Sequence, residues 1–123
     1  MAARAPLVVL RRHTADITRV VYSSDGRLLA SASGDKNVCL WDTQTRALLA
    51  TLPHGSCVYG VAFNLNGSRL AAGCADNTIR LWDLARREEV AELRGHEDYV
   101  HAVAFSPDGT RLVSASGDAT VRV

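Results

Sequence analysis

The residues of this 123-residue chain that could carry out chemistry are histidines, serines and aspartates that recur together. The first set is His13, Ser31 and Asp35. A second set has the same internal spacing near the other end of the chain: His96, Ser114 and Asp118. A histidine placed between a carboxylate and a serine can activate the hydroxyl as a nucleophile, so either set alone would suggest nucleophilic catalysis.

The recurrence of the sets argues against catalysis, because an enzyme needs one such site and not one in each repeat. A related middle set keeps His54 and Asp76 but has Ala72 at the serine position, so the hydroxyl is dispensable. Neither serine lies in a Gly-x-Ser-x-Gly turn with an oxyanion-binding loop. We therefore expect no catalytic residue and no enzymatic activity.

Metal and cofactor sites are also not indicated. His96 and His101 are five residues apart, a spacing that does not bring them together on a strand. The cysteines (Cys39, Cys57 and Cys74) fall at non-equivalent positions and form no Cys-x-x-Cys pair, so they are expected to be free thiols. No glycine-rich phosphate loop is present. We predict no metal and no cofactor.

The elements that position these residues belong to an internal repeat. The stretch Ala75–Asp83 has a near copy at Gly34–Asp42, and a third copy begins at Gly117-Asp118. The copies are about 41 or 42 residues apart, a period typical of solenoids, propellers and other arrays.

Each copy predicts three strands joined by tight turns. The dipeptides Asp25-Gly26, Asn66-Gly67 and Asp108-Gly109 are typical of type I′ hairpins, and Asp35, Asp76 and Asp118 mark a second turn. The strands lie around Val20, Val61 and Val103, and at Leu28–Ala32, Leu70–Gly73, Leu112–Ala115, Asn37–Trp41, Thr78–Trp82 and Thr120–Val123.

A fourth strand is expected between the copies, at Ala47–Leu52 and Glu89–Leu93. Local propensity favours a helix over Leu84–Leu93, but the register of the repeat outranks it. An equivalent outer strand, Leu7–Leu10, precedes the first copy. The resulting units are residues 13–52 (unit one), 54–93 (unit two) and 96–123 (unit three), the last one incomplete, and the whole chain 1–123 is one segment of such units.

The repeated motifs resemble those of the WD-repeat β-propeller family over nearly the whole chain, from Leu7 to Val123. The pattern is a histidine, then Val-Ala-Phe-Ser-Pro-Asp-Gly, then Leu-Val-Ser-Ala-Ser-Gly-Asp, then Ile-Arg-Leu-Trp-Asp. The resemblance implies an all-β fold of about three propeller blades, each a four-stranded antiparallel sheet. It also implies that histidine, serine, aspartate and tryptophan form a structural network within each blade.

By that resemblance, the network of unit one comprises His13, Ser31, Asp35 and Trp41. Unit two has His54, Asp76 and Trp82, with Ala72 as a gap. Unit three has His96, Ser114 and Asp118. A buried polar network of this kind makes a fold rigid when every member is satisfied.

The predicted partner-binding face is the channel mouth, where loops from successive blades gather. The variable positions there are Asp16, Thr18, Cys57, Tyr59, Tyr99 and His101. Tyr59 and Tyr99 are prominent because tyrosine is enriched at interfaces. The alternative is that both rings simply pack against neighbouring blades.

Composition limits the kinds of partner. A net charge of +1 gives no electrostatic reason to expect nucleic acid or an anionic membrane. No apolar run is long enough for a signal peptide or a membrane span. We expect an intracellular protein, in the cytoplasm or the nucleus.

The expected function is a non-catalytic scaffold or adaptor that binds proteins or peptides. Two alternatives remain open: a regulatory or sensor segment of a larger signalling or enzyme chain, and a self-assembling structural unit. Propellers close with four to eight blades, so three blades predict either a fragment of a longer ring or a six-bladed ring formed by two chains.

Overall fold

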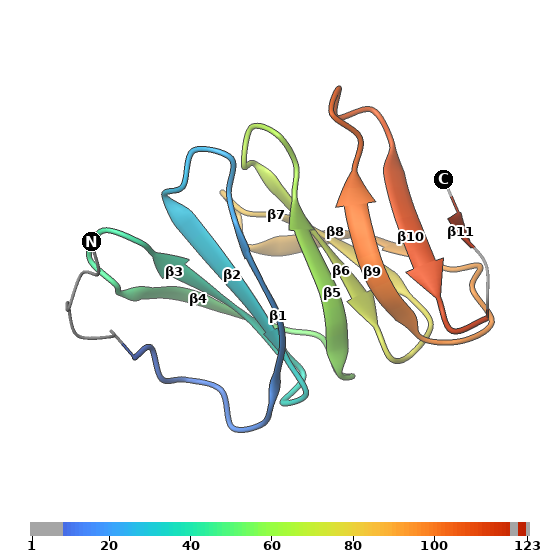
Figure 1. Cartoon of the computed structure of the whole chain (residues 1–123), viewed down its shortest axis with the longest axis horizontal. Coiled ribbons are helices and arrows are strands. Elements are labelled where there is room, and N and C mark those ends of the chain that lie inside the picture. Colours follow the sequence, from blue (N-terminus) through green and yellow to red (C-terminus); the bar gives the residue numbers. More distant parts are fainter. Residues whose placement is uncertain (1–8, 119–120, 123) are drawn as a thin grey trace, which may run out of the picture.

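The computed structural model describes residues 9–118 and 121–122, with side chains up to residue 118, and it is built from β-strands. The strands form three antiparallel sheets stacked side by side in chain order (Figure 1). Sheet one contains β1 (Ile17–Tyr22), β2 (Leu28–Ser33), β3 (Asn37–Asp42) and β4 (Leu48–Pro53). Sheet two contains β5 (Val58–Phe63), β6 (Arg69–Cys74), β7 (Ile79–Asp83) and β8 (Glu88–Leu93). Sheet three, as far as it is described, contains β9 (Val100–Phe105), β10 (Leu112–Ser116) and β11 (Val121–Arg122).

Each sheet is a simple up-and-down meander. The orders β1-β2-β3-β4 and β5-β6-β7-β8 follow the chain, as does β9-β10-β11. The all-β prediction is therefore confirmed, and so is the strand over Glu89–Leu93, where local propensity favours a helix. The described residues contain no helix that could cross a membrane.

The type I′ prediction for the first turns is wrong. A type I′ turn needs positive φ at both central residues, but only the glycine of each dipeptide has one: 72° at Gly26, 72° at Gly67 and 73° at Gly109. In each turn, the glycine amide donates to the carbonyl three residues earlier, as Gly26 does to Ser23 at 2.9 Å. The preceding aspartate or asparagine instead uses its side chain to accept the amide two residues on, as Asp25 does from Arg27.

The two ends of the chain fall partly outside the described residues. Leu7 and Val8 of the expected outer strand lie outside them, and Val9 and Leu10 do not form a strand. Of the expected strand Thr120–Val123, the described part is β11.

The main core lies between sheets one and two. Sheet one contributes the small and branched residues Ala30, Ala32, Val38, Leu40 and Leu52. We call this side of a sheet the trailing face. Sheet two contributes Val58, Val61, Leu70, Ala72 and Trp82, on what we call the leading face. Because side chains alternate along a strand, each sheet has one leading and one trailing face.

The junction between sheets two and three depends on glycine. Two positions on sheet two have no room for a side chain: a Cβ on Gly60 would lie 2.9 Å from Cα of Ala102, and one on Gly73 would lie 2.8 Å from Cγ1 of Val100. The first strands of the two sheets, β5 and β9, therefore approach closely along the inner edge of the stack (Figure 1).

Candidate functional site

In unit one the predicted network residues form a continuous hydrogen-bonded chain. His13 Nδ1 lies 2.9 Å from Asp35 Oδ2, and its Nε2 lies 2.7 Å from Ser31 Oγ. The indole Nε1 of Trp41 donates to the same Ser31 Oγ at 3.0 Å. Ser31 on β2 and Trp41 on β3 both lie on the leading face of sheet one, so strand pairing brings the hydroxyl and the indole together.

Asp35 determines where the protons lie in the hydrogen-bonded network of His13, Ser31 and Trp41. Burial alone would raise the pKa of its carboxyl, but hydrogen bonds from the Thr14 amide, the His13 ring and the Asn37 amide lower that pKa below its usual value. An ionised Asp35 accepts a proton that His13 carries on Nδ1, and in the neutral form of the ring Nε2 then accepts from the Ser31 hydroxyl. The serine oxygen then accepts the indole N–H.

The hydrogen bonds from Asp35 through His13 to Ser31 have the connectivity of a hydrolytic triad, but the Ser31 hydroxyl is inaccessible. Ser31 is 3% exposed and lies under the indole that donates to it. A nucleophile must reach substrate, so the arrangement joins β2, β3 and the segment before β1 without exposing a reactive oxygen.

Unit three repeats the geometry. His96 Nδ1 lies 3.0 Å from Asp118 Oδ2, and Nε2 lies 2.7 Å from Ser114 Oγ. The Glu97 amide donates to Asp118 as the Thr14 amide does to Asp35. Both His96 and Ser114 are buried.

Unit two departs from the expected network because Asp76 does not bind His54. With Ala72 in place of the serine, Trp82 Nε1 donates directly to His54 Nε2 at 2.9 Å. His54 Nδ1 donates to the Leu52 carbonyl. Burial lowers the pKa of His54 from 6.5 to about 4, which keeps the ring neutral and its Nε2 an acceptor.

Asp76 is instead part of an ion-pair network on the surface of sheet two. It accepts hydrogen bonds from Thr78 and from Arg80, whose guanidinium lies 3.0 Å from its Oδ2. Arg80 also pairs with two glutamates of β8, Glu89 at 2.9 Å and Glu92 at 3.1 Å. The aspartate therefore joins the turn before β7 to β8 and not to the histidine.

The predicted partner-face residues lie at equivalent places in the three sheets. The carbonyls of Asp16, Cys57 and Tyr99 each accept an amide from the turn after the second strand of their sheet. The donors are Gly34, Ala75 and Gly117. These residues therefore share one end of the stack.

Two of the predicted face residues contact the neighbouring sheet. The Thr18 hydroxyl donates to the Val58 carbonyl at 2.5 Å, and the Cys57 thiol donates to the Gly34 carbonyl at 3.5 Å. Both contacts join units one and two, so these two side chains hold adjacent sheets together.

The remaining aromatic residues form a cluster across units two and three. The rings of Tyr59 and Tyr99 meet edge to face, with centroids 5.4 Å apart, and His101 lies 5.9 Å from Tyr99. The Tyr99 ring lies against Gly117, where a Cβ would be only 2.4 Å from the ring. Even so, Tyr99 stays 41% exposed.

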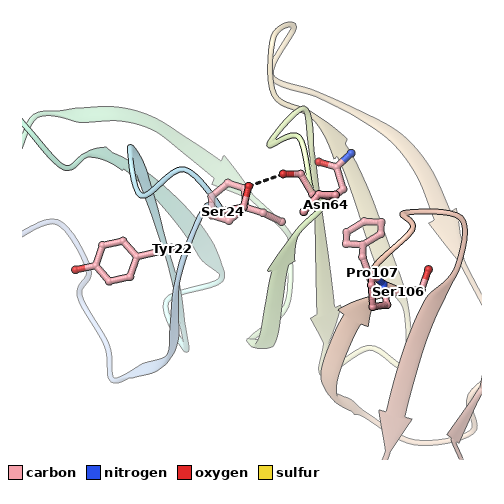
Figure 2. Close-up of a pocket in the computed structure, with 8 residues that line it drawn as sticks. Tyr22, Ser24, Asn64, Ser106 and Pro107 are labelled. Carbon is pink, nitrogen blue, oxygen red and sulfur yellow. Dashed lines mark hydrogen bonds between the residues drawn. The ribbon is translucent and has the colours of Figure 1, made fainter.

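A hollow that the sequence reasoning missed lies at the other end of the stack. It has a volume of about 220 Å³ and is lined by the first turns of all three units, including Ser24, Asn64 and Pro107 (Figure 2). The Ser24 hydroxyl donates to the Leu65 carbonyl there at 2.5 Å. The repeated aromatic position of Tyr22, Phe63 and Phe105 is the signal that could have indicated it.

The residues that the structure describes do not gather three or more histidine, cysteine or acidic side chains as a metal site would. The three cysteines are free thiols. Burial raises the pKa of Cys39, and it raises that of Cys74 to about 12, so both are held as neutral thiols.

Comparison with known families gives one result. The family model described as "WD domain, G-beta repeat" matches three times, at residues 4–42, 46–83 and 87–123. The second match begins just before β4 and ends with β7, so it takes the outer strand first and the three inner strands after it.

Proposed function

The chain belongs to the WD-repeat family, and we propose that it is a non-catalytic scaffold that binds proteins or peptides at the channel-mouth end of the stack. WD repeats generally serve as protein-interaction scaffolds. The proposed face is formed by Asp16, Tyr59, Tyr99 and His101, and Thr18 and Cys57 join adjacent sheets at the same end of the stack.

The observation that carries the proposal is the pair of Tyr59 and Tyr99. Their edge-to-face contact orients both rings, so little side-chain entropy remains to be lost when a partner binds. Tyr99 is nevertheless 41% exposed, which a ring serving only to pack two sheets would not need to be. Rigid, partly exposed tyrosines of this kind are common anchors of protein interfaces.

The test is capture of partners from a cell extract, followed by affinity measurement with each purified partner. We expect Tyr99→Ser to weaken binding by about 30-fold, the effect of losing a hot-spot residue of about 2 kcal/mol. Leu65→Ser is the matched control, because Leu65 is exposed but lies in a turn at the opposite end of the sheet. Equal affinities of wild type and Tyr99→Ser would overturn the proposal.

The proposal that the scaffold is non-catalytic rests on the burial of Ser31 under Trp41. A broad screen with ester and amide substrates should find no turnover that depends on the serine. A hydrolase activity abolished by Ser31→Ala, in a variant that remains folded, would contradict it.

A second candidate function, self-assembly, is favoured by the leading face of sheet one. Val20 is 55% exposed, whereas its equivalent Val61 is 2% exposed because sheet one covers it. Ile17 and Tyr22 are similarly exposed beside Val20, and apolar patches of this kind mark association sites. We propose that a second copy covers this face through its own trailing face.

Native mass measures this directly. We expect the wild type to have the native mass of two chains and Val20→Asp to have that of one chain. The circular dichroism of the two proteins should be the same. A single-chain mass for the folded wild type across micromolar concentrations would exclude self-assembly.

We also propose an intracellular location. The support is that Cys39, Cys57 and Cys74 are all free thiols, as is usual in reducing compartments. Fractionation of cells expressing the tagged chain tests this.

A further inference from the structure

The segment before β1 carries two arginines and a hydroxyl in close succession. Arg11, Arg12, His13 and Thr14 follow one another, so the Thr14 hydroxyl has a guanidinium group both two and three residues before it. Thr14 is the only serine or threonine of the sequence with arginine or lysine at both of these positions. Protein kinases select their substrates partly by such charge patterns. The spacing therefore indicates a substrate of a kinase that binds basic residues.

The structure leaves this segment accessible. Arg11, Arg12 and Thr14 are exposed, and residues 9–16 form no strand. Figure 1 shows the segment passing outside sheet one before it enters β1. Neither arginine forms an ion pair with another of the described residues. Both guanidinium groups are therefore free to bind the carboxylates of an enzyme.

The Thr14 hydroxyl differs from other exposed hydroxyls of the chain. The hydroxyls of Thr18, Ser24 and Thr43 each donate to a backbone carbonyl. Thr14 uses its backbone amide as a donor, but its Oγ1 has no hydrogen-bond partner within the part of the chain that the structure describes. Modification of this oxygen therefore breaks no side-chain hydrogen bond.

Unit three shows that the fold accepts a negative charge at this position. Thr14 and Glu97 are equivalent, because each follows the histidine of its unit. The amide of Thr14 donates to Asp35 at 3.0 Å, and that of Glu97 donates to Asp118 at 2.9 Å. The hydrogen bonds of the two histidines are also alike, although a carboxylate side chain follows only the second. A phosphate on Thr14 is therefore compatible with the network of unit one.

We propose that Thr14 is phosphorylated by a kinase that recognises arginine two and three residues before the acceptor hydroxyl. In this reaction Thr14 Oγ1 attacks the γ-phosphorus of ATP and forms a new O–P bond. The bond from that phosphorus to the bridging oxygen breaks and releases ADP, and the hydroxyl proton passes to a base of the kinase.

The product adds about two negative charges beside the turn that follows β2. Asp35 lies in that turn, at the channel-mouth end of the stack, and Asp16 lies two residues after Thr14. Phosphorylation therefore makes this end of unit one more acidic. The inference does not depend on the proposed partner face, because the acceptor and the recognition residues all precede it in the chain.

The experiment incubates the folded 123-residue chain with Mg·ATP and the catalytic subunit of cyclic-AMP-dependent protein kinase, which has this specificity. Mass spectrometry of peptides locates the phosphate. We expect one phosphate per chain, on Thr14, and none on Thr14→Val, which has nearly the same shape but no hydroxyl. A phosphate elsewhere in the folded chain with Thr14 unmodified would contradict the proposal.

Arg11→Ala and Arg12→Ala test the recognition. Each variant removes hydrogen bonds made by a charged group and should lower kcat/KM by about 10- to 150-fold. Arg86→Ala is the matched control, because Arg86 belongs to another exposed arginine pair, with Arg87, and should leave kcat/KM unchanged. Wild-type kinetics in both Arg11→Ala and Arg12→Ala would show that the arginines are not recognised.

Two further results would overturn the proposal. One is phosphorylation of a synthetic peptide of residues 8–18 but not of the folded chain, which would mean that the fold hides the hydroxyl. The other is loss of the β-sheet circular dichroism signal in the phosphorylated chain. We expect that signal to be unchanged in the phosphorylated chain and in Thr14→Glu, which places the residue type of Glu97 at the equivalent position.

Discussion

His54 should make the stability of the chain depend on pH. Burial lowers the pKa of this histidine from 6.5 to about 4 in the folded chain, while the unfolded chain keeps the usual value. Protonation of Nε2 would also place an N–H against the Trp82 N–H that donates to it. The unfolded state therefore binds the proton more readily, and stability falls as pH falls from 6.5 towards 4.

The size of the effect follows from the same pKa. A depression from 6.5 to about 4 corresponds to about 3 kcal/mol when the full range is crossed. Between pH 7 and pH 5 about 2 kcal/mol of this is lost, because the unfolded histidine is then almost fully protonated and the folded one is not.

The assay is urea denaturation followed by tryptophan fluorescence at pH 7, 6 and 5, for wild type and His54→Gln. Glutamine offers an oxygen to the Trp82 N–H but does not titrate. We expect the free energy of unfolding to fall by about 2 kcal/mol more in wild type than in the variant.

Acidic residues do not produce this difference. The pKa values of Asp35 and Asp76 are lowered in the folded chain, so their contribution to the stability of the fold is lost only as pH falls near and below 3.8. Wild type and His54→Gln contain both aspartates, so this loss is the same in the two proteins. Parallel pH profiles for wild type and His54→Gln would refute the reasoning and would mean that His54 titrates normally in the folded chain.

Three further predictions concern packing and reactivity. Trp82→Ala should cost about 3–5 kcal/mol in urea denaturation, since it empties the core between sheets one and two; near wild-type stability would show that the indole is not core. Gly60→Ala should cost about 1–3 kcal/mol through overpacking against sheet three, whereas Gly34→Ala, with its nearest atom at 3.7 Å, should change the melting temperature little; equal costs would disprove the close approach. Iodoacetamide at pH 8 should alkylate the half-buried Cys57 well before the buried Cys74. Mass spectrometry of peptides can follow the two reactions, and the reverse order would contradict the burial of Cys74.

The strands could be predicted because the equivalent segments of the repeat can be compared, and a segment of uncertain secondary structure is assigned from its counterpart in another unit. Residues 84–93 contain alanine, leucine, arginine and glutamate, which favour a helix in isolation. The equivalent segment of unit one contains Thr51 and a denser apolar run, and the common register assigns β8 correctly. Pairing with β7 through Ile79 and Leu93 then outweighs the propensity of the segment.

The details of the site depended on single substitutions that a pattern does not resolve. Asp76 occupies the same place in the motif as Asp35, but Arg80 lies four residues after it and attracts its carboxylate. The type I′ prediction for Asp25-Gly26 failed because the aspartate side chain accepts the Arg27 amide, which holds the turn with one positive φ in place of two. In both cases a side-chain hydrogen bond decided the local geometry.

Ala72 makes the hydrogen bonds of unit two depend on the absence of a hydroxyl at this position. In unit one the serine hydroxyl separates the histidine from the tryptophan, while in unit two those rings bond each other at 2.9 Å and His54 donates its other proton to Leu52. A serine at position 72 would add a hydroxyl where both ring nitrogens of His54 already have partners. The repeats therefore share a fold but not the same hydrogen bonds, and Ala72→Ser alone does not reproduce the network of unit one.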